Sequence, residues 1–95
     1  MRVIAKSRLI ALATAYGDCI LQASDWYSIA SKAEWHSLSE VRQTFRHADL
    51  VGDITVFNIK GNDYRLIVYI RYEAGVIYVK ELLTHAEYDK GGWKA

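Results

Sequence analysis

Hydrophobic residues in the first third of the chain recur with a helical period. Within residues 18–34, Ala23, Trp26, Tyr27, Ala30 and Ala33 recur at separations of three or four positions, and this spacing predicts an amphipathic helix. We expect one helix there and another over about 7–15. Ser7 and Asp18 are residue types favoured as N-caps, and Gly17 is typical of a helix end.

Two shorter elements complete the first half of the chain. Residues 37–40 (SLSE) form the pattern of a capping box, in which the first serine and the glutamate satisfy the N–H groups at the start of a helix. We expect a third, short helix from this point, with Val41 and Phe45 on one side. Residues 2–5 are expected to form a short first strand.

After Gly52 the hydrophobic period changes from near 3.6 to 2, which is typical of half-buried strands. Gly61-Asn62 and Ala74-Gly75 are tight-turn signals. The strands expected around these turns cover residues 54–59, 64–72 and 76–83. Three successive strands joined by tight turns predict an antiparallel meander.

The order of the elements, helices first and strands afterwards, predicts an α+β fold. A sheet this apolar cannot leave both faces in water, so the N-terminal helices are expected to pack on one face of a small curved antiparallel sheet. The chain has 95 residues, no proline and no linker-like segment. We therefore expect one domain over residues 1–95.

Composition adds limits to the possible functions. The chain is 52% hydrophobic and 24% charged, with a formal net charge of +1. General nucleic-acid binders are usually more basic, so positive charge that meets RNA must be concentrated locally. Cys19 is the only cysteine and no apolar run is long enough to span a bilayer, which favours the cytoplasm and no membrane partner over a disulfide-bonded or membrane setting.

The strand expected over 64–72 carries the first candidate chemistry. Alternation places Arg65 and Arg71 on the face opposite the apolar one. Lys60 enters the turn beside Arg65, and two cations there would form a phosphate site. Alternatively, these cations are solvated and pair with acidic neighbours such as Asp63 or Glu73.

The second group of candidate catalytic residues lies in the segment 84–90 (THAEYDK), directly after the last strand. His85 has an unperturbed pKa near 6.5, which suits proton transfer at neutral pH. Tyr88 lies three residues further on and shares a face with His85 if the segment is helical. The alternative is a merely solvated tail. A zinc site is not expected, because no second histidine or cysteine stands at ligand spacing from His85.

Several segments together resemble HigB toxins of type II toxin–antitoxin systems. The first half matches at Trp35 before the predicted capping box and at 48–52 (ADLVG), and the second half at 57–62 (FNIKGN), 64–66 (YRL) and 84–90 (THAEYDK). The resemblance covers nearly the whole chain and departs from the family at the ending, 91–95, where family members are often longer.

This resemblance implies a RelE-like fold and a specific activity. The implied activity is metal-independent, cofactor-free cleavage of mRNA in the ribosomal A site, which inhibits translation. It also implies a helix-turn-helix, HigA-like antitoxin that binds and silences the toxin. The pair would bind operator DNA only as a complex.

The implied mechanism gives each candidate residue a role. Arg65 would stabilise the phosphate, and Lys60 would add a second charge. His85 would act as general acid or base, and Tyr88 as an acid, hydrogen-bond donor or stacking surface. Glu87 and Asp89 are expected to be solvated or to orient His85. The side chains expected to contact RNA are those of Lys90, Arg71 and Asn58.

Two other readings remain open at this point. A catalytically inactive RelE-fold module could act only through antitoxin and operator-DNA binding. An unrelated small metabolic enzyme could use His85, although the sequence shows no sign of the apolar pocket it would need. His36 and His47 are expected to be structural or surface residues, and Trp26 and Tyr27 to belong to the core.

Overall fold

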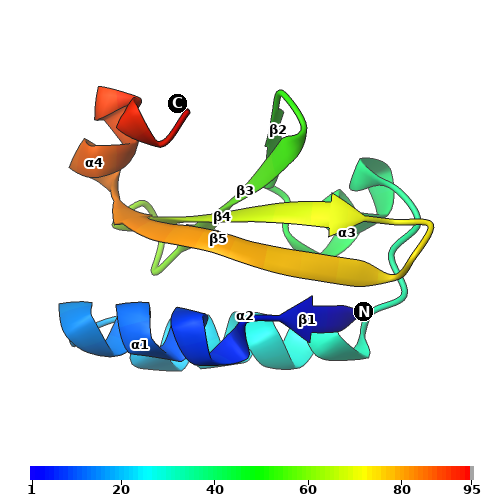
Figure 1. The fold of residues 1–95 in the computed structure, drawn as a ribbon, viewed down its shortest axis with the longest axis horizontal. Coiled ribbons are helices and arrows are strands. Elements are labelled where there is room, and N and C mark those ends of the chain that lie inside the picture. The colour runs from blue at the N-terminus through cyan, green and yellow to red at the C-terminus, as the bar shows by residue number, and fades with distance from the viewer. Residues whose placement is uncertain (95) are drawn as a thin grey trace.

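The computed structural model describes residues 1–94 of the chain (Figure 1). Its helices are α1 (Lys6–Tyr16), α2 (Ile20–Lys32), α3 (Leu38–Thr44), α4 (His85–Lys90) and the 3₁₀ turn η1 (Gly92–Lys94). Its strands are β1 (Arg2–Ile4), β2 (Asp49–Val51), β3 (Ile54–Ile59), β4 (Tyr64–Arg71) and β5 (Val76–Thr84). Within residues 1–94, no helix has both the length and the apolar character needed to cross a membrane.

The five strands form one open sheet in the order β1-β5-β4-β3-β2. The predicted antiparallel meander is confirmed as β3, β4 and β5. The prediction of a wholly antiparallel sheet is wrong at one edge, because β1 pairs with β5 in parallel. A parallel pair requires a crossover connection, and the chain that includes α1 and α2 supplies it. The edge strand β2 was not predicted, since three residues are too few to show an alternating pattern.

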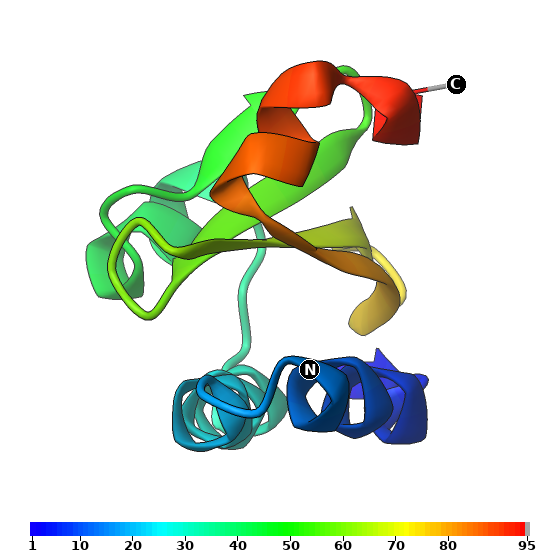
Figure 2. The same ribbon diagram turned by 90° about the vertical axis from the view of Figure 1, so that its left-hand side faces the viewer.

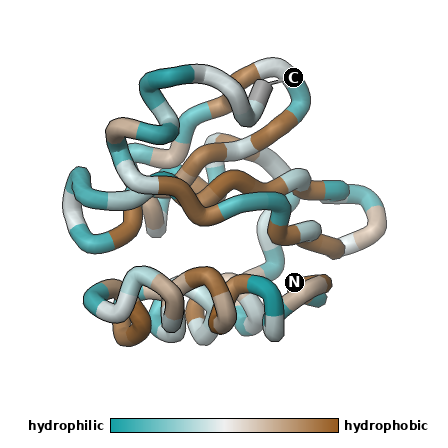
Figure 3. The backbone as a smooth tube through the Cα atoms, turned by 60° about the vertical axis from the view of Figure 1, so that its left-hand side comes forward, coloured by the Kyte–Doolittle hydropathy of each residue, from teal (hydrophilic) through white to brown (hydrophobic). Residues whose placement is uncertain are grey.

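Helices α1 and α2 lie side by side and cover one face of the sheet, as predicted (Figures 1 and 2). Their inward residues include Leu9, Ala13 and Trp26, which belong to the same buried cluster as Phe57 and Leu66 of the sheet. The hydropathy of the chain follows this layering: the central strands are mostly hydrophobic, and hydrophilic residues gather at turns (Figure 3). Helix α4 lies on the other side of the sheet from α1 and α2.

The helix starts differ from two of the three predictions. Ser7 does not cap α1, whose N-cap is Ala5 in the left-handed region with φ 71°. Asp18 does not cap α2, which follows Cys19; its carboxylate binds other side chains instead. The predicted cap of α3 is confirmed, because the hydroxyl of Ser37 accepts the N–H of Glu40.

The aromatic centre of the core gives a direct test of the fold. Phe57 is fully buried and its ring packs against Trp26, Trp35 and Phe45. We expect Phe57→Ala to lower the free energy of unfolding by about 3–5 kcal/mol, since it removes a large buried ring and leaves a cavity. Leu21→Ala, at a side chain that is 75% exposed, should cost less than about 0.5 kcal/mol. Equal effects in urea unfolding would contradict this packing.

Candidate active site

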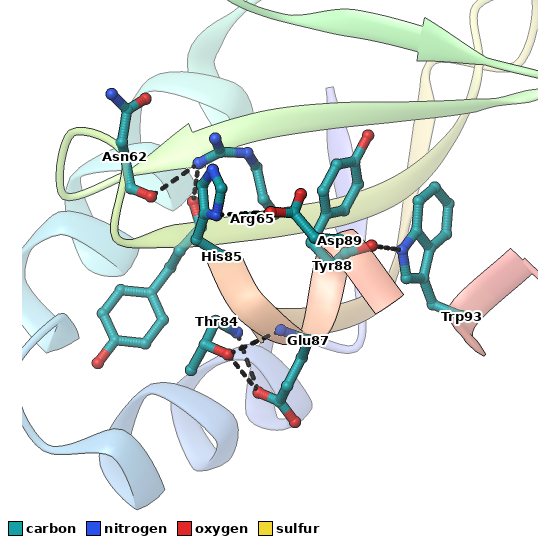
Figure 4. A network of polar contacts seen from close by, with 9 residues as sticks. Asn62, Arg65, Thr84, His85, Glu87, Tyr88, Asp89 and Trp93 are labelled. Atoms are coloured by element: carbon teal, nitrogen blue, oxygen red, sulfur yellow. Dashed lines mark hydrogen bonds and ion pairs between the residues drawn. The ribbon is translucent and has the colours of Figure 1, made fainter. Parts of the chain in front are cut away.

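The pairing of β4 with β5 brings the two candidate segments together. Tyr64, the first residue of β4, lies opposite Thr84, the last residue of β5. Helix α4 begins at the next residue, His85, whose backbone N–H donates to the carbonyl of Asp63 at 3.0 Å. The strand with Arg65 and the helix with the histidine therefore meet at one end of the sheet (Figure 4).

Helix α4 is fixed at its start by a capping box. The hydroxyl of Thr84 accepts the backbone N–H of Glu87 at 3.1 Å, and the carboxylate of Glu87 accepts the backbone N–H of Thr84 at 3.1 Å. The helix ends at Gly91, whose φ of 76° suits glycine. A helix of six residues is too short to be stable alone, so these contacts and its packing define its position.

One side of α4 is attached to α1. The hydroxyl of Tyr16 lies 3.0 Å from the Glu87 carboxylate and 2.9 Å from the carbonyl oxygen of Leu82. Burial, followed by the hydrogen bond to Glu87, raises the pKa of Tyr16 to about 12. Hydrogen bonds from Thr84, first from its backbone and then from its hydroxyl, lower the pKa of Glu87. The contact thus joins a neutral phenol to an ionised carboxylate.

A second acidic residue, Asp18, binds two side chains beneath the same end of the sheet. Asp18 accepts a hydrogen bond from the hydroxyl of Tyr64 and forms an ion pair with Lys60 at 2.9 Å. These two contacts, with that of Tyr64 the larger, lower the pKa of Asp18, and the pKa of Tyr64 rises to about 12 mainly through the same bond. The ring of Tyr64 lies 4.8 Å from that of Tyr16, so the two contacts adjoin.

Arg65 lies on the face of the sheet that α1 and α2 do not cover. One guanidinium nitrogen, Nη1, donates to the carbonyls of Asn62 and Tyr64 at 3.1 and 3.2 Å. The guanidinium carbon lies 5.8 Å from the ring centre of Tyr88. Within residues 1–94, Arg65 forms no ion pair with a carboxylate. Its charge is therefore held in one place and uncompensated, which suits the binding of a phosphate.

His85 is oriented by a carboxylate of its own helix. Its Nδ1 lies 3.0 Å from the carboxylate of Asp89, and both side chains are at least half exposed. The carboxylate fixes the proton on Nδ1 and so leaves Nε2 to exchange a proton with a ligand. The sequence had left open whether Asp89 orients His85 or is only solvated; the contact favours the orienting role. Glu87 faces Tyr16 instead.

Tyr88 lies between Arg65 and a residue that sequence reasoning had left without a role, Trp93 (Figure 4). The rings of Tyr88 and Trp93 stack at 4.8 Å with 14° between their planes, and the indole N–H donates to the carbonyl of Tyr88 at 2.8 Å. Trp93 also lines a hollow of about 290 Å³ with Val51 and Ile54. The only sequence signal was an aromatic residue just after the helix-ending glycine.

The other predicted residues divide into two groups. Asn58 lies directly opposite Arg65 on β3 and shares its face. Lys60 forms its ion pair with Asp18, which also binds Tyr64. Lys60 and Arg65 therefore do not form the shared phosphate site that the sequence predicted. Arg71 forms an ion pair with Glu73 at 3.0 Å, six residues along β4 and roughly 20 Å from Arg65. Lys90 is exposed in the last turn of α4.

The structure therefore brings together Arg65, His85, Tyr88 and Asn58, and adds Asp89 and Trp93. Histidine can transfer protons, and the guanidinium of an arginine can bind a phosphate and stabilise the negative charge that develops on it during a reaction. Residues 1–94 contain no group of three or more histidine, cysteine, aspartate or glutamate side chains arranged to hold a metal ion. The arrangement suits acid–base chemistry at a phosphodiester.

Helices packed on one face of an open sheet, with an arginine and a short C-terminal helix on the other, are consistent with a RelE-like fold. A sequence model described as "HigB_toxin, RelE-like toxic component of a toxin-antitoxin system" matches residues 21–91. The chain therefore belongs to the HigB toxin family. The matched span includes Arg65, His85 and Tyr88, whereas Tyr16 and Trp93 lie outside it.

Relatives of known name support the same family. The chain is 28% identical over 93 residues to the mRNA interferase HigB of Escherichia coli O6:H1, covering 95% of this chain and 90% of that protein. It is 30% identical over 84 residues to the mRNA interferase toxin HigB of Escherichia coli K12, covering 88% and 70%. The mRNA interferase HigB of Shigella flexneri matches with the same figures.

The hydrogen-bonded phenols predict a loss of stability at alkaline pH. Tyr16 and Tyr64 have pKa values raised from 10.0 to about 12. In the unfolded chain they ionise near pH 10 while the folded chain keeps them neutral, so their contribution is complete below pH 10 and is lost as the pH rises towards 12. Tyr16→Phe should make the free energy of unfolding, measured in urea, decline less steeply over this range. An unchanged slope would contradict the contact with Glu87.

The capping box of Thr84 and Glu87 predicts that loss of the Thr84 hydroxyl destabilises α4 locally. Thr84→Ala should cost about 1 kcal/mol, and hydrogen exchange should accelerate at the backbone amides of α4. Ser37→Ala is the matched control, because it removes the corresponding cap from α3 and should accelerate exchange there and not in α4. Exchange in α4 that is the same in both variants would show that the cap does not hold this helix.

Proposed function

We propose that this chain is an mRNA interferase: an endoribonuclease that cleaves mRNA on the ribosome without a metal ion and thereby inhibits translation. One observation carries the proposal. The guanidinium of Arg65, which has no carboxylate partner within residues 1–94, and the carboxylate-oriented His85 adjoin the same turn, because the guanidinium donates to the carbonyl of Asn62 and the backbone N–H of His85 donates to the carbonyl of Asp63. Membership of the HigB toxin family and the names of the relatives support it.

The proposed reaction needs no nucleophile from the protein. The ribose 2′-oxygen attacks the adjacent phosphorus, the bond from phosphorus to the 5′-oxygen breaks, and a 2′,3′-cyclic phosphate and a 5′-hydroxyl are formed. One group must remove the 2′-hydroxyl proton and another must protonate the leaving oxygen, each contributing about 10²–10⁴-fold. A fixed positive charge at the phosphorane contributes about 10²–10³-fold more.

Arg65 and His85 take the principal roles. The guanidinium of Arg65 binds a non-bridging phosphate oxygen and stabilises the charge that develops there. The imidazole of His85 transfers a proton through Nε2 while Asp89 holds Nδ1. Tyr88, held between Arg65 and Trp93, donates a hydrogen bond or stacks on a base. A neutral phenol is a poor base, so Tyr88 is not assigned the removal of the 2′-hydroxyl proton.

The remaining cations contribute to the proposal in a different way. Lys60 acts by holding Asp18, and through it Tyr64, beneath the site; a direct catalytic contact would require this ion pair to open. Lys90 and Arg71 are proposed to contact RNA outside the reacting linkage. For Arg71 the contact with RNA would replace its ion pair with Glu73. That ion pair is exposed to solvent and therefore weak.

The toxin of a toxin–antitoxin system has an antitoxin as its partner. We propose that this antitoxin is a HigA-like helix-turn-helix protein, encoded next to the toxin, and that operator DNA is bound only through the complex. We also propose that the toxin acts in the cytoplasm, where translated mRNA is available.

Inducible expression with matched variants tests the proposal. The wild type should arrest growth, and mapping of mRNA ends should show cleavage within translated regions. In a translation reaction with purified protein, Arg65→Ala should reduce the cleavage rate about 10²–10³-fold, and His85→Ala about 10²–10⁴-fold. Arg2→Ala, at an exposed arginine on the edge strand β1, should leave the rate unchanged.

The possible contrary outcomes are distinct. Arrest and cleavage that persist in both Arg65→Ala and His85→Ala would contradict the proposed site. Cleavage of naked mRNA at the same rate as translated mRNA would contradict dependence on the ribosome. A wild type that neither arrests growth nor cleaves mRNA, but binds an antitoxin, would favour the catalytically inactive binding module.

A further inference from the structure

A second feature lies on the β3 side of Arg65. Thr44, Phe45, Arg46, His47, Ala48 and Asn58 line a hollow of about 270 Å³. It lies beside the segment 45–48, which connects α3 to β2. This segment does not pair with β3, because the β2–β3 pairing extends only to Asp49 opposite Val56. The edge of β3 beside Asn58 is therefore not covered by β2.

The hollow has a fixed apolar wall. Phe45 packs edge-on against Trp35 and Phe57, at ring distances of 6.0 and 5.2 Å, and Ala48 is 3% exposed. Arg42 fixes the segment between α3 and β2. Its Nε donates to the carbonyl of Ala48 at 2.9 Å, and the same guanidinium pairs with Asp49 at 3.5 Å. The wall is thus held by the core and by an ion pair and does not depend on a ligand.

The polar side chains around this wall are not engaged with the protein. Within residues 1–94, the side chains of Arg46, His47 and Asn58 form no hydrogen bond or ion pair. This contrasts with the nearby Arg42, which has two partners. An apolar wall surrounded by an unpaired guanidinium, an imidazole and an amide matches the chemistry of a nucleotide, which combines a flat base, hydrogen-bonding edges and a phosphate.

The position of the hollow identifies which nucleotide it would take. Asn58 lies opposite Arg65 in the β3–β4 register, and side chains at such positions are roughly 5 Å apart at Cβ. A strand of RNA whose reacting phosphate lies on Arg65 therefore has its neighbouring nucleotide within reach of Asn58.

We propose that this hollow is a nucleotide subsite that binds the residue next to the cleaved linkage. The base lies against Phe45, the amide of Asn58 hydrogen-bonds its edge, and Arg46, with His47 beside it, binds the following phosphate. The proposal rests on the proposed RNA-cleaving function and adds to it a determinant of sequence preference. It assigns a role to Arg46 and to His47, of which the sequence predicted only His47, as a structural or surface residue.

The test compares Arg46→Ala and Asn58→Ala with wild type in a translation reaction, with cleavage ends mapped over many sites. Asn58→Ala should flatten the base preference at one position beside the cut. Arg46→Ala should raise KM about fivefold to tenfold and leave kcat nearly unchanged, because a phosphate contact away from the reaction adds uniform binding. Lys32→Ala, which removes an exposed charge from α2, is the matched control and should change neither.

The outcomes separate this inference from the proposed function. If the wild type fails to cleave mRNA, the function itself fails. If the wild type cleaves, while Arg46→Ala and Asn58→Ala keep its base preference and KM, the subsite is overturned. If these variants cleave normally but bind the antitoxin more weakly, the hollow and the open edge of β3 serve the antitoxin instead. Arg46 is on an exposed loop, so its variant decides the matter even if Asn58→Ala folds poorly.

Discussion

The pairing of Tyr64 with Thr84 at the end of the β4–β5 ladder is the constraint on which the site depends. It fixes the residue at which β5 stops, and the capping box of Thr84 turns the chain into α4 at that point. The face that carries Arg65 is then set by alternation along β4, and the face that carries Tyr88 by the turn of the helix. A shift of one residue in this register would move Arg65 towards the core and separate it from α4.

Helix α4 has two sides with different tasks. Through Glu87 it is held to Tyr16 of α1, beside the contacts of Asp18 with Tyr64 and Lys60. On its other side it presents a histidine and a tyrosine to the arginine. The carboxylates of Asp18 and Glu87 are thus bound by phenols and a lysine below the site, whereas no carboxylate in the described part of the chain pairs with the guanidinium of Arg65 above it. This separation gives a protein of net charge +1 a local positive site.

The sequence predicted those features that local rules determine. Alternation from Gly52 onwards indicated β3, β4 and β5, and thereby the face on which Arg65 lies. Features that depend on distant partners could not be predicted: the parallel pairing of β1 with β5, the ion pair that engages Lys60, and the stacking of Trp93 on Tyr88. The prediction that Asp18 caps a helix is wrong, because a residue suited to capping is equally suited to accept hydrogen bonds from Lys60 and Tyr64, and only the fold decides between these roles.

The proposed activity requires that Arg65 and the exposed side of α4 form a single phosphodiester site. Nuclear magnetic resonance with a dinucleotide whose 2′-hydroxyl is replaced by hydrogen tests it most directly, because the ligand binds but cannot react. If these residues form one site, the side-chain signals of Arg65, His85 and Tyr88 will shift together, with one dissociation constant. Shifts at Arg65 without shifts at His85, or shifts confined to the surroundings of Lys60 and Asp18, would contradict it.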